Sequence, residues 1–231
     1  DGQRCLAMRD GEDVSLKSRN KQWLNTTYPE IVGVLEEQSC DRILVDGEIV
    51  AFHGAVTSFS RLQSRMQIKD ADEARTSRVA VYYYVFDLLY LDGYETTKLA
   101  LRDRKKLLRR VLSFNDPLRF TAHRNTEGEA FYKEACRKGW EGSIAKQADS
   151  VCQHKRAKEW LKFKCVSRQE FVIGGYTDPQ GERTGFGALL IGFYDEGDLV
   201  YAGKVGTGYD DQTLKKLGKR LASKKQKKSP F

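Results

Sequence analysis

Two kinds of hydrophobic pattern alternate along the chain. Short runs rich in β-branched and aromatic residues, bounded by turn residues, predict strands over 5–9, 42–52, 79–91, 142–146 and 160–164. Apolar residues at helical spacing predict helices over 30–37, 101–114 and 127–138, and Gly139 follows the last of these as a C-terminal stop. The polar stretch 69–78 is expected to form a loop or a short exposed helix. These elements predict an α+β domain over about 1–166.

The pattern changes after Gln169. Three apolar runs separated by glycine-rich turns predict a meander of strands over 171–173, 185–194 and 199–205, followed by a helix from 210 to about 221. Three strands leave an open sheet edge, which normally needs a pairing strand. We therefore expect an unfinished barrel or sandwich, truncated at its C-terminal side.

Composition indicates a globular protein. Of 231 residues, 40% are hydrophobic and 11% aromatic, which is enough to bury a core and argues against disorder. The longest uncharged apolar run, 79–86, is far shorter than the roughly 18 residues of a membrane span, and no signal segment opens the chain. We expect a soluble, cytoplasmic protein that has no membrane partner.

Positive charge is concentrated in the last third of the chain. The net charge is +8, and residues 151–231 hold 16 basic and 9 acidic side chains. This asymmetry favours a polyanionic partner such as nucleic acid, although charge alone fits a solvated basic tail equally well. The five cysteines are irregularly spaced and include no Cys-x-x-Cys pair, so neither a disulfide framework nor a structural zinc site is expected.

Strand alternation places two pairs of charged residues on common faces. Asp46 and Glu48 point the same way from an apolar strand, which is costly unless the acids are used. Lys162 and Lys164 also share a face, where they suit an anion or form the solvated side of an edge strand.

Two further residues are candidates for binding. Glu141 lies between glycines at the start of a strand and suits either a Mg²⁺ site or an ordinary turn. Phe86 shares a face with Tyr82 and Tyr84, which suits either nucleobase stacking or plain aromatic packing.

The order and spacing of these segments resemble the motif series of the covalent nucleotidyltransferases, and within them the ATP-dependent DNA ligases. The segments are Asp1-Gly2-x-Arg4, Ser18-Arg19-Asn20, Asp46-Gly47-Glu48, Phe86 to Gly93, Glu141-Gly142-x-x-x-Lys146 and Lys162-x-Lys164. The tail segments 171–177, 183–187 and 201–208 are similar to the ligase module of bacterial non-homologous end-joining ligases, the ligase D family.

This resemblance implies an α+β adenylyltransferase domain over 1–166 and a C-terminally truncated oligonucleotide-binding (OB) β-barrel domain over 169–231. The first motif of the family is Lys-x-Asp-Gly, so the nucleophilic lysine is expected two residues upstream of Asp1. The last motif, which helps orient pyrophosphate, is expected after Phe231. The chain by itself is therefore not expected to adenylate itself.

The resemblance also implies roles for individual residues. Arg4 and Glu48 would hold the ribose hydroxyls of ATP, Phe86 would stack on adenine, and Glu141 would bind Mg²⁺ or Mn²⁺. Lys162 and Lys164 would contact the α-phosphate and keep the nucleophilic lysine neutral. The DNA backbone would be held by basic residues, namely Arg19 at the nick and Lys204, Lys224, Lys225, Lys227 and Lys228 in the tail.

The implied function is sealing of 5′-phosphate/3′-hydroxyl nicks through lysyl-AMP and DNA-adenylate intermediates, in bacterial double-strand break repair. Nicked or broken duplex DNA would be the substrate, with the Ku protein and fused polymerase and phosphoesterase modules as partners, at the bacterial nucleoid. The alternatives are an RNA ligase, an mRNA capping guanylyltransferase and a non-catalytic nucleic-acid-binding fragment.

Overall fold

The structure is a computed structural model that describes residues 2–153, 158–165 and 170–231. It divides into two compact units, Asp1–Cys165 and Val166–Phe231. Each unit is described separately below.

The first unit contains, among the described residues, a seven-stranded sheet. Its main path, in spatial order, is β2 (Asp13–Ser18), β1 (Gln3–Asp10), β3 (Arg42–His53), β5 (Val81–Leu91) and β6 (Tyr94–Glu95). Two short strands lie off this path, β4 (Val56–Thr57) on β3 and β7 (Leu118–Phe120) on β5. Neighbouring strands are antiparallel, except that β7 runs parallel to β5.

One face of this sheet forms the hydrophobic core with helices. Buried residues such as Val45 on β3 and Val85 on β5 belong to one cluster with Ile31 of α1 (Pro29–Glu36) and Leu108 of α4 (Leu101–Val111). The helices α2 (Phe59–Met66) and α3 (Ala71–Thr76) lie between β4 and β5 in the chain. Alternate residues of a strand point to opposite faces of the sheet. The residues between the buried ones therefore lie on the other face, where they can form a site.

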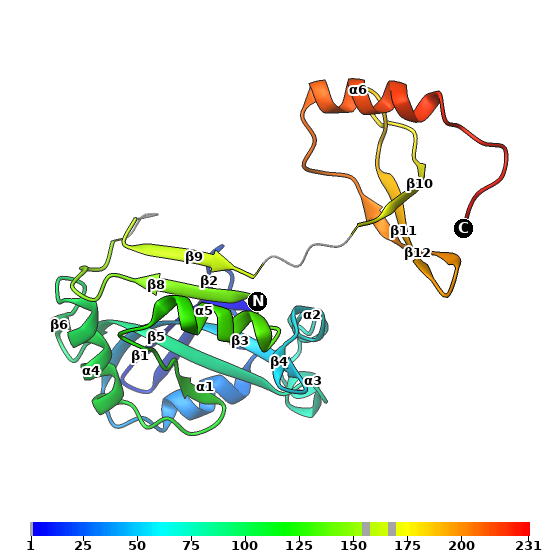
Figure 1. The fold of residues 1–231 in the computed structure, drawn as a ribbon. Helices are drawn as coiled ribbons and strands as arrows, with labels where there is room; N and C mark the ends of the chain where they lie inside the picture. The colour runs from blue at the N-terminus through cyan, green and yellow to red at the C-terminus, as the bar shows by residue number, and fades with distance from the viewer. Residues whose placement is uncertain (1, 154–157, 166–169) are drawn as a thin grey trace. The chain divides into compact units, whose positions relative to one another are not determined.

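A smaller layer lies on the opposite side of the sheet from α1 (Figure 1). It consists of α5 (Gly128–Arg137) and the antiparallel hairpin β8 (Gly142–Lys146) and β9 (Trp160–Lys164). The rings of Trp160 and Phe86 meet edge to face with centroids 6.0 Å apart, which joins the hairpin to β5. Tyr132 of α5 packs on Phe163 and donates a hydrogen bond to the Lys164 carbonyl at 2.8 Å.

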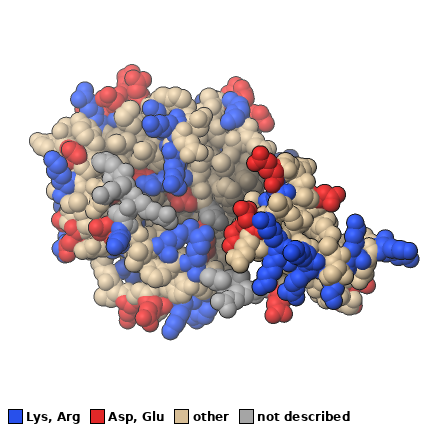
Figure 2. Space-filling model, turned by 90° about the horizontal axis from the view of Figure 1, so that it is seen from above, with Lys and Arg blue, Asp and Glu red and all other residues tan. Residues whose placement is uncertain are grey.

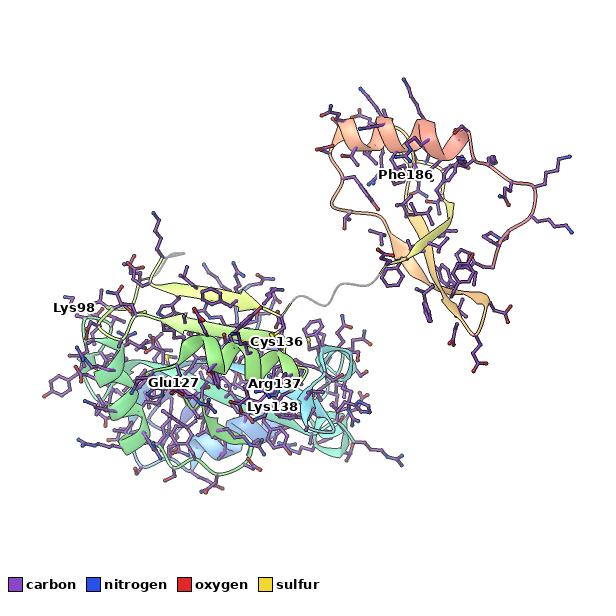
Figure 3. The ribbon with its side chains drawn as sticks, viewed as in Figure 1. Lys98, Glu127, Cys136, Arg137, Lys138 and Phe186 are labelled. Atoms are coloured by element: carbon purple, nitrogen blue, oxygen red, sulfur yellow. A yellow bond between two sulfur atoms is a disulfide. The ribbon has the colours of Figure 1, made fainter. Side chains whose placement is uncertain are left out.

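A disulfide joins Cys136 to Cys165, which corrects the expectation drawn from cysteine spacing. Cys136 lies on α5 (Figure 3), and Cys165 directly follows β9, so the pairing arises from packing of two elements 29 residues apart. Spacing along the chain carries no sign of such a contact. Among the described residues, Cys5, Cys40 and Cys152 are free thiols.

The second unit contains, in its described part, a three-stranded antiparallel sheet and a helix. The strands β10 (Val172–Tyr176), β11 (Leu189–Asp195) and β12 (Asp198–Val205) form the predicted meander. The helix α6 (Asp211–Ala222) is capped by Asp210, whose side chain accepts the Thr213 backbone N–H at 2.7 Å. Phe186, labelled in Figure 3, is fully buried in the small core of this unit.

The remaining predicted elements are confirmed within a few residues, with informative differences. The sequence pattern does not predict β2 or α2; α2 is mostly polar and buries only Leu62 and Arg65. The helix expected over 101–114 ends at Val111, because Leu112 is already extended. The polar stretch 69–78 contains the short helix α3. Of the helices in the described residues, none has the length and apolar character needed to cross a bilayer.

Candidate active site

The open face of the sheet brings the first and third predicted motifs together. Arg4 on β1 lies opposite Glu48 on β3, so both side chains start from the same face. The Nε of Arg4 donates to Oδ1 of Asp46 at 3.0 Å, and its Nη2 donates to Oδ2. Burial raises the pKa of Asp46, and the Arg4 guanidinium opposes that rise. Asp46 is thus the residue that orients Arg4, a role that the sequence analysis did not assign.

Glycines beside these residues permit close approach of neighbouring strands. A Cβ on Gly2 would lie 2.7 Å from Cγ of Glu48, and a Cβ on Gly47 would lie 2.5 Å from the ring of Tyr83. Real Cβ atoms essentially never come this close to other heavy atoms. Gly2 therefore has a steric reason on the open face, and Gly47 has one on the core side of β3, where Tyr83 is buried.

Phe86 projects from β5 toward the hairpin. Its ring contacts Trp160, and the ammonium of Lys146 on β8 lies 4.3 Å from its centroid and 3.5 Å from that of Trp160. Phe86 is half-buried, as a stacking surface beside a binding site should be. The structure therefore places the β5 aromatic and the β8–β9 hairpin in one site.

Lys146 stands out electrostatically, although it was not among the candidate residues. Burial and the nearby charge of Lys105 lower its pKa to about 7, against the opposing influence of Asp87 and Asp46. The ammonium therefore lies where the aromatic ring faces attract a cation but water is largely excluded. Its place at the end of the motif that begins at Glu141 was the signal that could have identified it.

Glu141, Lys162 and Lys164 form a compact charged cluster, called the Glu141 group below. Lys162 Nζ and Lys164 Nζ lie 2.6 Å and 3.0 Å from Oε1 of Glu141. The lysines are placed by the hairpin register, in which Lys164 lies opposite Gly142. Burial alone would raise the pKa of Glu141, but hydrogen bonds, including those from both lysines, lower it to about 2. The anion that the two lysines hold here is the Glu141 carboxylate.

A metal ion could join this group through a single carboxylate. In the described part of the chain, no three His, Cys, Asp or Glu side chains gather as a metal cluster. Mg²⁺ in nucleotide sites is commonly bound by one or two carboxylates together with substrate phosphates. A single carboxylate at Glu141 fits that mode of binding.

The predicted DNA contacts are exposed. Arg19 lies in the turn after β2, and Lys204 lies on β12. The four lysines that follow α6 are all exposed, namely Lys224, Lys225, Lys227 and Lys228. The exposed side of α6 adds Lys215, Lys216, Lys219 and Arg220. Figure 2 shows basic side chains gathered in patches on the surface in view.

The chain belongs to the ATP-dependent DNA ligases: the model of the ATP dependent DNA ligase domain matches residues 1–164, and that of the ATP dependent DNA ligase C terminal region matches residues 182–231. The family and the mixed α+β fold with an OB-like C-terminal region, both expected from the motifs, are confirmed.

Its relatives include bacterial end-joining proteins. The chain is 35% identical over 237 residues to the multifunctional non-homologous end joining protein LigD of Pseudomonas aeruginosa, and 36% identical over 236 residues to LigD of Mycobacterium tuberculosis. These matches cover 100% of this chain but only 27% and 29% of the relatives, so the chain spans less than a third of their length.

Solved structures agree with this relationship. The ligase domain of M. tuberculosis LigD matches at 34% identity with a TM-score of 0.62. A mycobacterial DNA ligase D complexed with ATP and MES matches at 33% identity with a TM-score of 0.61. Each match covers 100% of this chain and 72% of the solved chain.

Proposed function

We propose that this chain is the catalytic core of an ATP-dependent DNA ligase that seals 5′-phosphate/3′-hydroxyl nicks during bacterial double-strand break repair by end joining. The observation that carries the proposal is the convergence of Phe86 and the Arg4–Asp46 pair with the hairpin that bears Glu141, Lys162 and Lys164. The sequence similarity to LigD proteins extends over the whole of this chain, which supports the repair context.

Nucleotide binding would use the open face of the sheet. Adenine would stack on Phe86, and Arg4 and Glu48 would hold the ribose hydroxyls. Arg4 is already oriented for this by its two hydrogen bonds to Asp46, which reduce the side-chain entropy lost on binding. The triphosphate would then extend toward the Glu141 group.

The first chemical step would form a lysyl-AMP. A lysine two residues before Asp1 would attack the α-phosphorus through its Nζ; the new N–P bond forms as the bond to pyrophosphate breaks. The lysine must be neutral, although its ordinary pKa is about 10.4. The ammonium groups of Lys162 and Lys164 would disfavour its protonated form and offset charge on the α-phosphate.

The contacts of Lys162 and Lys164 would change when ATP binds. Both ammonium groups hold the Glu141 carboxylate, so a bound triphosphate would have to share them. Mg²⁺ held through Glu141 would supply further neutralisation of phosphate charge. With a pKa of about 2, Glu141 stays ionised at neutral pH and so remains a competent ligand.

The later steps would act on DNA. AMP would pass from the lysine to the 5′-phosphate at a nick, and the 3′-hydroxyl would then displace AMP and close the strand. Arg19 would contact phosphates at the nick, while Lys204 and the lysines after α6 would bind the duplex backbone without reading sequence. Ku and fused polymerase and phosphoesterase modules would be its partners at the nucleoid.

Covalent labelling tests this proposal. A longer chain that includes the residues before Asp1 and after Phe231 is incubated with Mg²⁺ and α-labelled ATP or GTP, then separated by denaturing electrophoresis. We expect label from ATP alone, discharged by pyrophosphate. Lys164→Ala is expected to reduce labelling by about 100-fold, in the range for a lost transition-state contact. Lys133→Ala, an exposed lysine on α5, is the matched control and should label normally.

Other results would select the alternatives. Label from GTP would indicate a capping guanylyltransferase, and sealing of RNA alone would indicate an RNA ligase. No label from either nucleotide, with retained binding to nicked DNA, would indicate a non-catalytic binding fragment. The relationship to LigD favours the DNA ligase over all three.

A further inference from the structure

The strand β5 loses its regular pairing where Phe86 leaves it. The consecutive β3 residues Asp46 and Gly47 pair with Asp87 and Val85. Phe86, between these two, therefore has no pairing partner on β3. A second skip follows at Leu89. A bulge leaves one residue unpaired, bends the strand and re-aims side chains. The ladder alone therefore does not determine the direction of Phe86.

Asp87, between the two bulges, is held by Arg104 of α4. The Nε and Nη2 of Arg104 donate to the two carboxylate oxygens of Asp87 at 2.7 and 2.8 Å. Its Nη1 donates to the carbonyls of Leu99 at 2.6 Å and Ser150 at 3.2 Å. The Asp87 carboxylate also accepts the Leu88 backbone N–H at 2.9 Å. One guanidinium thus ties the bulged segment to three other parts of the chain.

This pair is fully buried, with Arg104 0% and Asp87 1% exposed. Burying an ion pair costs desolvation, and apolar replacements are often as stable, so stability is a weak reason for its presence. Its distinctive property is geometry, because a planar fork fixes a carboxylate in position and orientation. The position it fixes is that of the residue next to Phe86.

The same unit contains a second buried arginine that pairs with a carboxylate. Arg65 of α2, 1% exposed, donates to both oxygens of Glu30 on α1 at 2.7 Å. This pair resembles Arg104–Asp87 in its buried guanidinium, but a single nitrogen, Nη2, makes both contacts, Glu30 is 32% exposed, and the pair joins two helices. It therefore separates general stabilisation from an effect on Phe86.

We propose that Arg104 is a positioning residue for the nucleotide site: by holding Asp87 between the two bulges, it sets the direction in which Phe86 presents its ring to the nucleobase. The inference rests on the proposed function, in which Phe86 stacks on adenine. Arg104 acts through Asp87 and Phe86 and does not itself contact ATP.

A double-mutant cycle tests this inference. Binding of α,β-methylene-ATP, which the lysine cannot cleave, is measured calorimetrically for the full chain, Arg104→Lys, Phe86→Leu and the double variant. Phe86→Leu removes base stacking and should weaken binding by about 10-fold. Arg104→Lys keeps the charge but loses the fork, and should weaken binding by about 5- to 10-fold, the size of a coupled contact. In the Phe86→Leu background, its effect should fall below about 2-fold.

The control uses the Arg65–Glu30 pair, whose arginine is buried. Arg65→Lys should also lower the unfolding temperature, because Arg65 is buried, yet it should change nucleotide affinity by less than about 2-fold. If Arg104→Lys does not fold, the neutral pair Asp87→Asn with Arg104→Gln takes its place in the cycle. It should restore folding and show the same coupling to Phe86.

The outcomes distinguish this inference from the proposed function. If Arg104→Lys weakens binding equally in both backgrounds, or if Arg65→Lys weakens it as much, Arg104 is a structural residue and the inference is wrong while ATP binding stands. If the unsubstituted chain does not bind the nucleotide at all, the proposed function fails and this inference fails with it.

Discussion

Lys146 has a pKa of about 7, so its charged and neutral forms have nearly equal free energy near neutral pH. Its Nζ lies over the rings of Phe86 and Trp160, which attract a cation, while burial disfavours the charge. The acidic groups near it already have other partners: Asp46 is bonded to Arg4, and Asp87 is bonded to Arg104. Removing the Lys146 charge therefore leaves neither carboxylate unpaired.

Lys146→Met should change the pH dependence of stability. The pKa of Lys146 is about 7 in the folded chain and about 10.4 when unfolded, so between these values the unfolded state binds more protons and stability rises with pH. Below pH 7, Lys146 is charged in both states, so the full cost of burying its charge lowers the stability of the folded chain. The variant should be more stable by a few kcal/mol near pH 7, and this difference should shrink toward pH 10. Urea unfolding at several pH values measures it; a difference that stays constant with pH would contradict the assignment.

Among the elements, two helices contain a glycine in very different surroundings. A Cβ added to Gly33 in α1 would meet nothing within 4 Å. A Cβ added to Gly218 in α6 would lie 2.9 Å from the Cα of Gly185, because the helix packs closely against the loop that contains Gly185. Alanine is favoured over glycine within a helix by about 1 kcal/mol, whereas overpacking costs about 1–3 kcal/mol. The same substitution should therefore have opposite effects.

Gly33→Ala should stabilise the first unit, and Gly218→Ala should destabilise the second. We expect the unfolding temperature to rise by about 3 °C for Gly33→Ala and to fall by about 4–8 °C for Gly218→Ala, given the sizes of the units. Calorimetry on each variant provides the measurement. A rise for both variants would mean that α6 does not pack closely against the loop that contains Gly185.

Sequence patterns predicted most elements and the motif residues, but they could not predict contacts that depend on tertiary packing. Strand alternation was sufficient to place Asp46 and Glu48 on one face. The pair Arg104–Asp87 is 17 residues apart and joins a helix to a bulged strand, so its spacing is unlike any local pattern. The disulfide between Cys136 and Cys165 escaped prediction for the same reason.

At the scale of the whole molecule, the two units divide the expected tasks. The first unit holds the face that we propose binds the nucleotide, together with the Glu141 group, and its described residues contain the larger core. The second has a small core and an exposed basic surface on and after α6. In the proposed function, covalent chemistry would therefore belong to the first unit, and most of the electrostatic attraction for DNA would belong to the second.

Sealing of a nicked duplex tests the central claim most directly. The longer chain is given a duplex with a labelled 5′-phosphate at a single nick, together with Mg²⁺ and ATP. We expect a transient DNA-adenylate followed by the sealed strand with ATP, and neither product with GTP. Folded chain that binds the nicked duplex and yet forms neither product with ATP would contradict the account.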